Sequence, residues 1–272
     1  MKKLSLLILL MTTLLLASCS SKKNTVTATE PSVVMPPLAT ACRTNAVWTR
    51  LEVPMSIELS APAKARLSGR LTMDYGNSLR FSVRVLGMEM GQLYADRDSV
   101  YLLIKPLKVA SVVSLNELKR STGMGLAELQ CVLAGQSFAP GEGRLTPQTA
   151  LRWYETNDNG MAGISSSGIC DVSFLYTPAL AGTMELTDTR ACRDDICVNI
   201  SYSDNIVTTA GVMPSVAQGA CDAGSTRVRA LWRLNWDRAR LDDVREASAP
   251  EIPSSYERLT PAQLIARLGS ML

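Results

Sequence analysis

The chain of 272 residues contains no histidine, and this absence limits the chemistry that its other residues can perform. Without an imidazole, Ser-His-Asp catalysis, Cys-His catalysis and histidine metal sites are all excluded. Ser-Lys and paired-carboxylate chemistry remain open in principle. The acidic pairs Asp194-Asp195 and Asp242-Asp243 lie among other charges, which is typical of solvated turns. We therefore predict no catalytic residue, no metal, no cofactor and no enzymatic activity.

One further segment has residue types that could bind a cation. Asn157-Asp158-Asn159-Gly160 offers side-chain oxygens and a glycine, as a calcium loop does. It lacks the later glutamate and the flanking helices of such a loop. Because Asn-Gly is also a strong signal for a tight hairpin, we interpret this segment as a turn between two strands.

The first cysteine of the chain, Cys19, lies in a segment that favours covalent modification rather than catalysis. A positive head is followed by an apolar run from Leu4 to Leu16, too short to span a membrane as a helix, and then by Leu16-Ala17-Ser18-Cys19. This pattern resembles the bacterial lipobox, in which the cysteine sulfur receives diacylglycerol and the chain is cut before the cysteine. We predict a signal peptide over 1–18 and a mature N-terminus at Cys19 that carries fatty acyl chains such as palmitate. Two or more such chains anchor a protein stably to a membrane.

The residue after the lipidated cysteine bears on where the protein is sorted. Ser20 stands where an aspartate would retain a lipoprotein at the inner membrane, so the resemblance implies an outer-membrane location in the cell envelope, and we expect the periplasmic side. Residues 19–40 are polar and contain three prolines, which is typical of a flexible tether. No second linker divides 41–272, so a single domain is expected.

An exported chain meets an oxidising compartment, where structural disulfides are favoured. Six cysteines follow Cys19: Cys42, Cys131, Cys170, Cys192, Cys197 and Cys221. Cys192 and Cys197 bracket four residues between two strand-like segments, so they are the candidate disulfide. Cys131 lies in an apolar helical segment and is expected to be a buried hydrophobe. Simple burial stays open for all six, and six cysteines allow 15 connectivities, so no other pairing is predicted.

The charge balance limits the class of partner. The full chain has 28 Lys and Arg residues against 25 Asp and Glu; without Lys2 and Lys3 its net charge falls from +3 to +1. No basic stripe with interleaved aromatic residues is present, so no nucleic-acid partner is expected.

Hydrophobic periodicity predicts the architecture. Apolar residues alternate with polar ones over 53–59, 71–75, 79–85, 198–202 and 228–236. A period of two with one polar face indicates antiparallel strands that cover a core on one side. Turns are expected between them, among others at 74–77, 96–99 and 203–205. Helices are predicted over 115–122, over 126–134 and from Thr260-Pro261 onward, where Leu264, Ile265, Leu268 and Met271 form an apolar stripe. The expected fold is mainly β, a curved antiparallel sheet forming a half-open barrel closed by a few helices.

A resemblance to a known family supports the same fold. Residues 80–89 (RFSVRVLGME), then Leu93 and Asp98-Ser99-Val100-Tyr101, and the helix 126–135 (LAELQCVLAG) resemble the core of a family of Gram-negative outer-membrane lipoproteins of unknown function. That family is distantly similar to the lipoprotein carriers LolA and LolB, whose half-open barrels close over an apolar cavity. The chain departs from its relatives at Gln92, where many have arginine, and in its extra cysteines between 170 and 221.

Two functions remain open at this point. The apolar concave face could bind acyl chains of lipids or lipoproteins, with a candidate apolar pocket formed by Leu71, Met73, Phe81, Val83, Trp232 and Leu234. Alternatively, the interior is filled by its own side chains, and the protein is a structural or interaction lipoprotein that serves as a scaffold for an envelope protein. Fold does not decide between these two functions, and alternation shows which side chains point inward without showing whether the interior is hollow.

Overall fold

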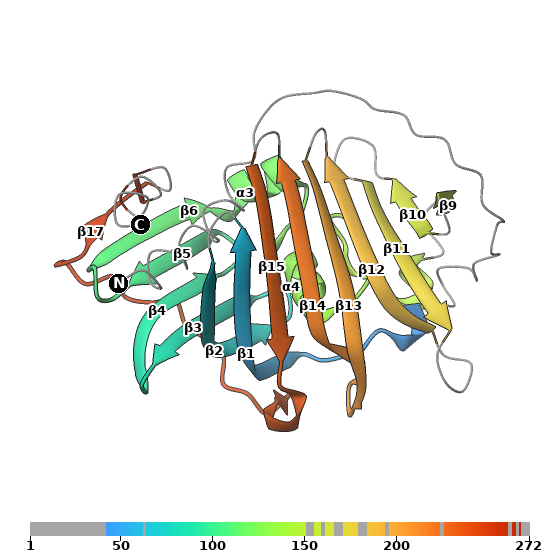
Figure 1. The fold of residues 1–272 in the computed structure, drawn as a ribbon, viewed down its shortest axis with the longest axis horizontal. Helices are drawn as coiled ribbons and strands as arrows, with labels where there is room; N and C mark the ends of the chain where they lie inside the picture. Colours follow the sequence, from blue (N-terminus) through green and yellow to red (C-terminus); the bar gives the residue numbers. More distant parts are fainter. Residues whose placement is uncertain are drawn as a thin grey trace.

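The computed structural model is dominated by one large curved antiparallel sheet (Figure 1). It describes residues 42–61, 64–150, 155–158, 161–165, 171–178, 184–193, 196–223, 226–260, 263, 264 and 267. The signal peptide, the lipobox Cys19, the tether and Cys170 lie outside these residues, so the predictions made for them stay predictions. In the part of the chain that is described, no helix is both long enough and apolar enough to cross a membrane.

Fifteen strands form the large sheet, in the spatial order β17-β6-β5-β4-β3-β2-β1-β15-β14-β13-β12-β11-β10-β9, with β16 paired to β1. They are β1 (Arg50–Ala61), β2 (Ala65–Asp74), β3 (Ser78–Val85), β4 (Met88–Ala95), β5 (Ser99–Ile104), β6 (Val109–Ser114), β9 (Glu155–Asp158), β10 (Met161–Ser165), β11 (Asp171–Pro178), β12 (Met184–Arg193), β13 (Ile196–Thr208), β14 (Gly211–Ala223), β15 (Thr226–Leu234), β16 (Arg240–Leu241) and β17 (Glu257–Arg258). Every pair in it is antiparallel except β17 with β6.

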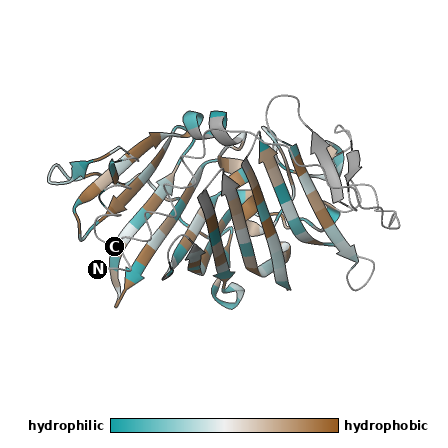
Figure 2. Ribbon diagram, turned by 45° about the horizontal axis from the view of Figure 1, so that its top comes forward, coloured by the Kyte–Doolittle hydropathy of each residue, from teal (hydrophilic) through white to brown (hydrophobic). Residues whose placement is uncertain are grey.

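The alternation of apolar and polar residues in the sequence corresponds to the alternation of side chains between the two faces of the sheet. Along β1, Leu51, Val53, Met55, Ile57 and Leu59 are buried, while the residues between them are partly exposed. The same pattern gives the strands of Figure 2 their brown and teal bands. We call the face that carries the buried side chains of β1 the inner face and the opposite one the outer face. The predicted fold class, a curved antiparallel sheet with few helices and no closure into a full barrel, is confirmed.

Residues 115–150 cover the inner face and are called the inner cover. They comprise α3 (Leu115–Thr122), α4 (Leu126–Ala134), the small hairpin β7 (Phe138–Ala139) and β8 (Gly143–Arg144), and α5 (Pro147–Ala150). Helix α4 lies behind the sheet in Figure 1. It ends at Gly135, whose φ of 65° lies in the left-handed region that glycine tolerates best. Both helices begin and end where the sequence predicts.

A second segment covers part of the outer face. After β15 the chain makes the short 3-10 helix η3 (Trp236–Arg238), pairs with β1 as β16, and reaches β6, where β17 adds a short parallel pairing. We call residues 240–260 the strap. Tyr94 on β4 and Leu103 on β5 point to the outer face by their register, yet both are buried. The strap therefore gives half of the sheet a second apolar layer that the sequence pattern did not predict.

Two predicted boundaries are wrong and one lies mostly outside the described residues. No turn forms at 203–205: β13 continues to Thr208, with Asp204 at a φ of 54° inside the strand. The last predicted strand stops at Leu234, although Trp236 stays buried in η3. Of the C-terminal helix only residues 263, 264 and 267 are described, as helical, and Leu264 is fully buried. The hairpin expected at 157–160 has its two strands paired as β9 and β10, with the tip at 159–160 undescribed.

Candidate functional site

The inner face is the surface on which the sequence placed a binding pocket. All six candidate pocket residues point to this face and are 1–7 % exposed: Leu71, Met73, Phe81, Val83, Trp232 and Leu234. They belong to one continuous cluster of buried apolar side chains. The structure thus brings the six into the same core, in contact with protein atoms rather than with open space. Whether they ever bind an acyl chain stays a prediction.

The inner cover occupies the concavity that an acyl chain would need. The indole Nε1 of Trp232 donates to the carbonyl of Leu133 on α4, and the Tyr202 hydroxyl donates to the carbonyl of Val132. Phe138 of the β7–β8 hairpin packs edge-on against Phe174 of β11, with ring centroids 5.7 Å apart. The inner cover is therefore attached both to the middle of the sheet and to strand β11.

A buried carboxylate holds the cover together. Glu128 on α4 accepts hydrogen bonds from the backbone N–H groups of Gly125, Gly141 and Gly143 at 2.9–3.1 Å. It therefore satisfies three backbone donors, two of them buried, that come from the start of α4 and from the hairpin. A carboxylate used in this way has a structural role.

A buried amide then joins the cover to the sheet. The Nε2 of Gln130 donates to the carbonyls of Asp74 and Ser78, and its Oε1 accepts from the N–H of Gly76. These three bonds fix α4 on the β2–β3 turn. The cover is consequently attached by directional bonds as well as by apolar packing, so removing it would leave several buried polar groups unpaired.

A guanidinium lies between two aromatic rings at the rim of this layer. Arg144 is stacked 4.8 Å from the Trp48 ring centroid and 4.2 Å from that of Tyr75. It donates to the Gln136 side chain and to the Trp48 carbonyl. Burial lowers the pKa of Arg144, partly offset by Cys131 and Tyr75 nearby. Arg144 thus joins the β7–β8 hairpin to the segment before β1 and to the β2–β3 turn through two cation–π contacts.

Cys131 is buried among these groups, as the sequence predicts. Its sulfur lies 4.0 Å from the Tyr75 hydroxyl, and burial raises the pKa of its thiol to about 12. A thiol with so high a pKa is protonated at neutral pH and is a poor nucleophile. Cys131 is therefore a packing residue.

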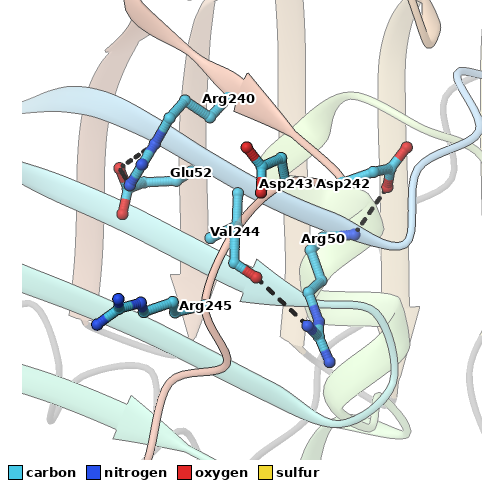
Figure 3. Close-up of a pocket in the computed structure, with 7 residues that line it drawn as sticks. All are labelled: Arg50, Glu52, Arg240, Asp242, Asp243, Val244 and Arg245. Carbon is cyan, nitrogen blue, oxygen red and sulfur yellow. Dashed lines mark hydrogen bonds and ion pairs between the residues drawn. The ribbon is translucent and has the colours of Figure 1, made fainter.

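The second candidate region is a hollow of about 660 Å³ on the outer face, between the strap and β1 (Figure 3). Six of its seven lining residues are charged: Arg50, Glu52, Arg240, Asp242, Asp243 and Arg245; the seventh is Val244. Glu52 accepts from Arg70 and from Arg240; burial opposes its ionisation, but these arginines outweigh it and lower its pKa. Backbone N–H groups of Thr49 and Arg50 bind Asp242 and lower its pKa.

These charged residues attach the strap to the sheet. Arg50 pairs with Asp74 at 3.2 Å and donates to the carbonyl of Val244, which is itself buried. Three arginines and three acidic residues line the hollow, so their charges cancel. Among the described residues no cluster of three or more Cys, Asp or Glu side chains could hold a metal ion. We assign the hollow a structural role, as the seat of the strap.

The predicted disulfide is present in the structure. Cys192 of β12 stands directly opposite Cys197 of β13, and the two are bonded. Both side chains lie on the outer face, at the end of a long hairpin. The bridge fixes the register of this hairpin at an end that no other described segment covers on the outer face.

A feature that the sequence analysis did not assign to a site is the tip of the β3–β4 hairpin. Leu86 is 94 % exposed, Met88 64 % and Val85 50 %. Arg84 precedes them, and Lys105 and Lys108 lie in the exposed β5–β6 turn. Lys105 donates its backbone N–H to the carbonyl of Met90, so the two turns are adjacent. The signal in the sequence was an apolar Val-Leu-Gly-Met segment at a predicted strand end, in a position where polar turn residues are usual.

Comparison with known proteins gives structural neighbours alone. No protein-family model matches the chain, and no curated protein matches it. Its fold is similar to a solved domain named as an outer membrane lipoprotein-sorting protein from Vibrio parahaemolyticus (10 % identity, 74 % of this chain and 88 % of that one, TM-score 0.43). It is also similar to a LolA superfamily protein from Nitrosomonas europaea (10 % identity, 76 % and 93 %, 0.40) and to a DUF1329 family protein from Desulfovibrio piger (8 %, 73 % and 88 %, 0.34).

The distant similarity to LolA-like proteins that the sequence motifs predicted is thus found among solved structures. At these identities and TM-scores the similarity carries no argument about function, which has to be argued from the residues of this chain.

Proposed function

We propose that this chain is a lipid-anchored, non-enzymatic protein of the Gram-negative cell envelope that acts through its surface at a membrane, with its interior filled by its own side chains. The observation that carries the proposal is the burial of all six candidate pocket residues beneath the inner cover. Glu128 and Gln130 fix that cover with six hydrogen bonds to backbone groups. A protein whose cavity is already occupied in this way meets its partners on the outside.

The exposed tip of the β3–β4 hairpin supports a membrane as one such partner. An apolar tip next to basic residues is the composition of a segment that enters the boundary between lipid head groups and acyl chains. Burying Leu86 and Met88 there is worth about 1.5–3 kcal/mol for each side chain. The proposed anchor at Cys19 would hold the domain near the outer membrane, on its periplasmic side, at the end of a flexible tether.

Lipidation at Cys19 is tested by mass spectrometry of the mature protein. The expected N-terminal residue is an acylated cysteine, and the Cys19→Ala chain should carry no acyl group while keeping its fold, because residue 19 precedes the described residues. An unmodified N-terminus at another residue would refute the anchor.

Acyl binding on the concave face is the competing function, and it makes a different prediction. Binding there requires the inner cover to leave, which would unpair the Tyr202 hydroxyl and the backbone groups of the β2–β3 turn that bond Gln130. A fluorescent fatty acid titrated into the Cys19→Ala chain should therefore show no saturable binding. Stoichiometric binding that unlabelled fatty acid displaces would instead favour a lipid or lipoprotein carrier, with the six inner-face residues as its lining.

A further inference from the structure

The outer face of β15 and β2 carries arginines that are not neutralised. Arg229 and Arg233 on β15 are exposed, and within the described part of the chain neither forms an ion pair. Arg66 on β2 is also exposed and pairs with Glu58 on the intervening strand β1 at 3.3 Å. Glu58 is thus already engaged, and the three arginines leave an excess of positive charge.

The register explains why these arginines stay unpaired. Arg233 stands opposite Ser56 on β1 and Val216 on β14, and Arg229 stands opposite Ala61 and Ala220. Small or uncharged residues at the facing positions leave the guanidinium groups without a carboxylate. The strap, which covers the outer face farther along the sheet, does not bury them.

The charged surface continues toward the hairpin tip. Arg84 at the end of β3 is exposed and has no ion pair among the described residues. Its neighbour Val83 pairs with Gly69, next to the exposed Ser68 of β2. Glu89 stands opposite Arg84 but pairs with Arg80 and Lys105, whose two positive charges exceed its own. Arg66, Arg84, Arg229 and Arg233, with the carboxylate of Glu58, form what we call the arginine patch, of net charge +3.

We propose that the arginine patch binds the phosphate groups of an anionic phospholipid bilayer. Guanidinium groups match phosphate oxygens with paired hydrogen bonds, and basic residues near an anionic lipid surface each add about 1 kcal/mol of attraction. The patch borders the apolar tip at Arg84, two residues before Leu86, so both surfaces can meet one bilayer. This inference rests on the proposed function and adds to it a preference for anionic lipid.

Co-sedimentation of the Cys19→Ala chain, prepared without residues 1–18, with vesicles tests the inference. Vesicles of phosphatidylcholine containing phosphatidylglycerol should bind at least tenfold more tightly than vesicles of phosphatidylcholine alone, and high salt should remove the difference. The double variant Arg229→Ser, Arg233→Ser should lower binding to the anionic vesicles by roughly tenfold or more, because two attractive charges are lost. Its control is Arg43→Ser, Lys119→Ser, which removes two exposed charges from η1 (Cys42–Thr44) and α3.

The outcomes separate the inference from the function on which it rests. Equal binding of the wild type to both kinds of vesicle, or an arginine variant that behaves like its control, would overturn the anionic preference. Binding to a soluble polyanion that competes fully with the vesicles would also overturn the assignment to a bilayer. Leu86→Ser tests the tip instead: it should weaken binding to both vesicles alike. If it has no effect while the anionic preference persists, the tip contact fails and the arginine patch stands.

Discussion

The two halves of the sheet are built on the same strand pattern but are covered differently. Strands β1–β6 have the inner cover on one face and the strap across much of the other, so Tyr94 and Leu103 are buried on the outer side. Strands β12–β15 have one covered face, and residues on their outer side, such as Asn199 and Arg233, are exposed. The covered half is a three-layer structure, and the open half is a two-layer structure with a surface free for contact.

The largest expected effect is on the free energy of unfolding. It comes from a leucine-to-alanine substitution on the outer face of the covered half, compared with the same substitution on the open half. Leu103→Ala removes a side chain buried under the strap and should lower the free energy of unfolding by about 2–4 kcal/mol. Leu231→Ala removes the same atoms from a partly exposed position on β15 and should cost less than about 1 kcal/mol. Urea unfolding of both variants measures the difference. Equal losses would mean that the strap does not form a second layer.

Reduction of the disulfide tests the open half. The loop that the Cys192–Cys197 bond closes is short, so the bond should stabilise the protein by less than the 2–4 kcal/mol typical of longer loops. Its loss should loosen the end of the β12–β13 hairpin and leave the covered half unchanged. Hydrogen exchange of the Cys192→Ser, Cys197→Ser variant should locate the change, and peptide mapping that recovers both cysteines as free thiols in the wild type would contradict the bond itself.

The smallest expected effect concerns the attachment of the strap at Asp242. Because two backbone N–H groups lower the pKa of this carboxyl, its contribution exists above the unfolded pKa and is lost as the pH falls through the lower folded pKa. Because Asp242 is exposed and solvent screens its interactions, Asp242→Ala should cost no more than about 1 kcal/mol at pH 7, and the part of this cost that comes from the carboxylate should be lost progressively below about pH 4. A gap that does not depend on pH would assign the effect to packing or to the left-handed φ of 61° at Asp242, which alanine tolerates less well than aspartate. Asp243→Ala, its exposed neighbour, serves as the control.

The difference between the covered and the open half of the sheet also explains which parts of the fold could be predicted from the sequence. Residues 198–202 and 228–234 alternate cleanly because water covers one of their faces, and the sequence identified both strands. Strands β4 and β5 lack that alternation because Tyr94 and Leu103 are buried under the strap, and the strap itself has no periodicity. The turn expected at 203–205 failed because Asp204 adopts a left-handed φ within a continuous strand.

The candidate site could also be predicted only in part. Alternation shows that Phe81 and Trp232 point inward, but the volume left between them depends on α4 and the β7–β8 hairpin, whose docking is set by the non-local bonds of Glu128, Gln130 and Arg144. The arginine patch needs the strand order as well, since β2 and β15 are distant in sequence and separated by β1 in space. The disulfide could be predicted because its two cysteines lie on adjacent strands of one hairpin.

The short pairing of β17 with β6 has a consequence for solubility. β6, with the sequence VASVVS, is rich in β-branched residues and would end the sheet with unpaired N–H and C=O groups, which is a template for strand addition by another molecule. Glu257 and Leu259 instead donate their N–H groups to the carbonyls of Lys108 and Ala110, and Glu257 and Arg258 place exposed charged side chains on the new edge strand. The C-terminal residues thus protect the chain against edge-to-edge polymerisation, so a truncation before Glu257 should produce a folded protein that self-associates as its concentration rises.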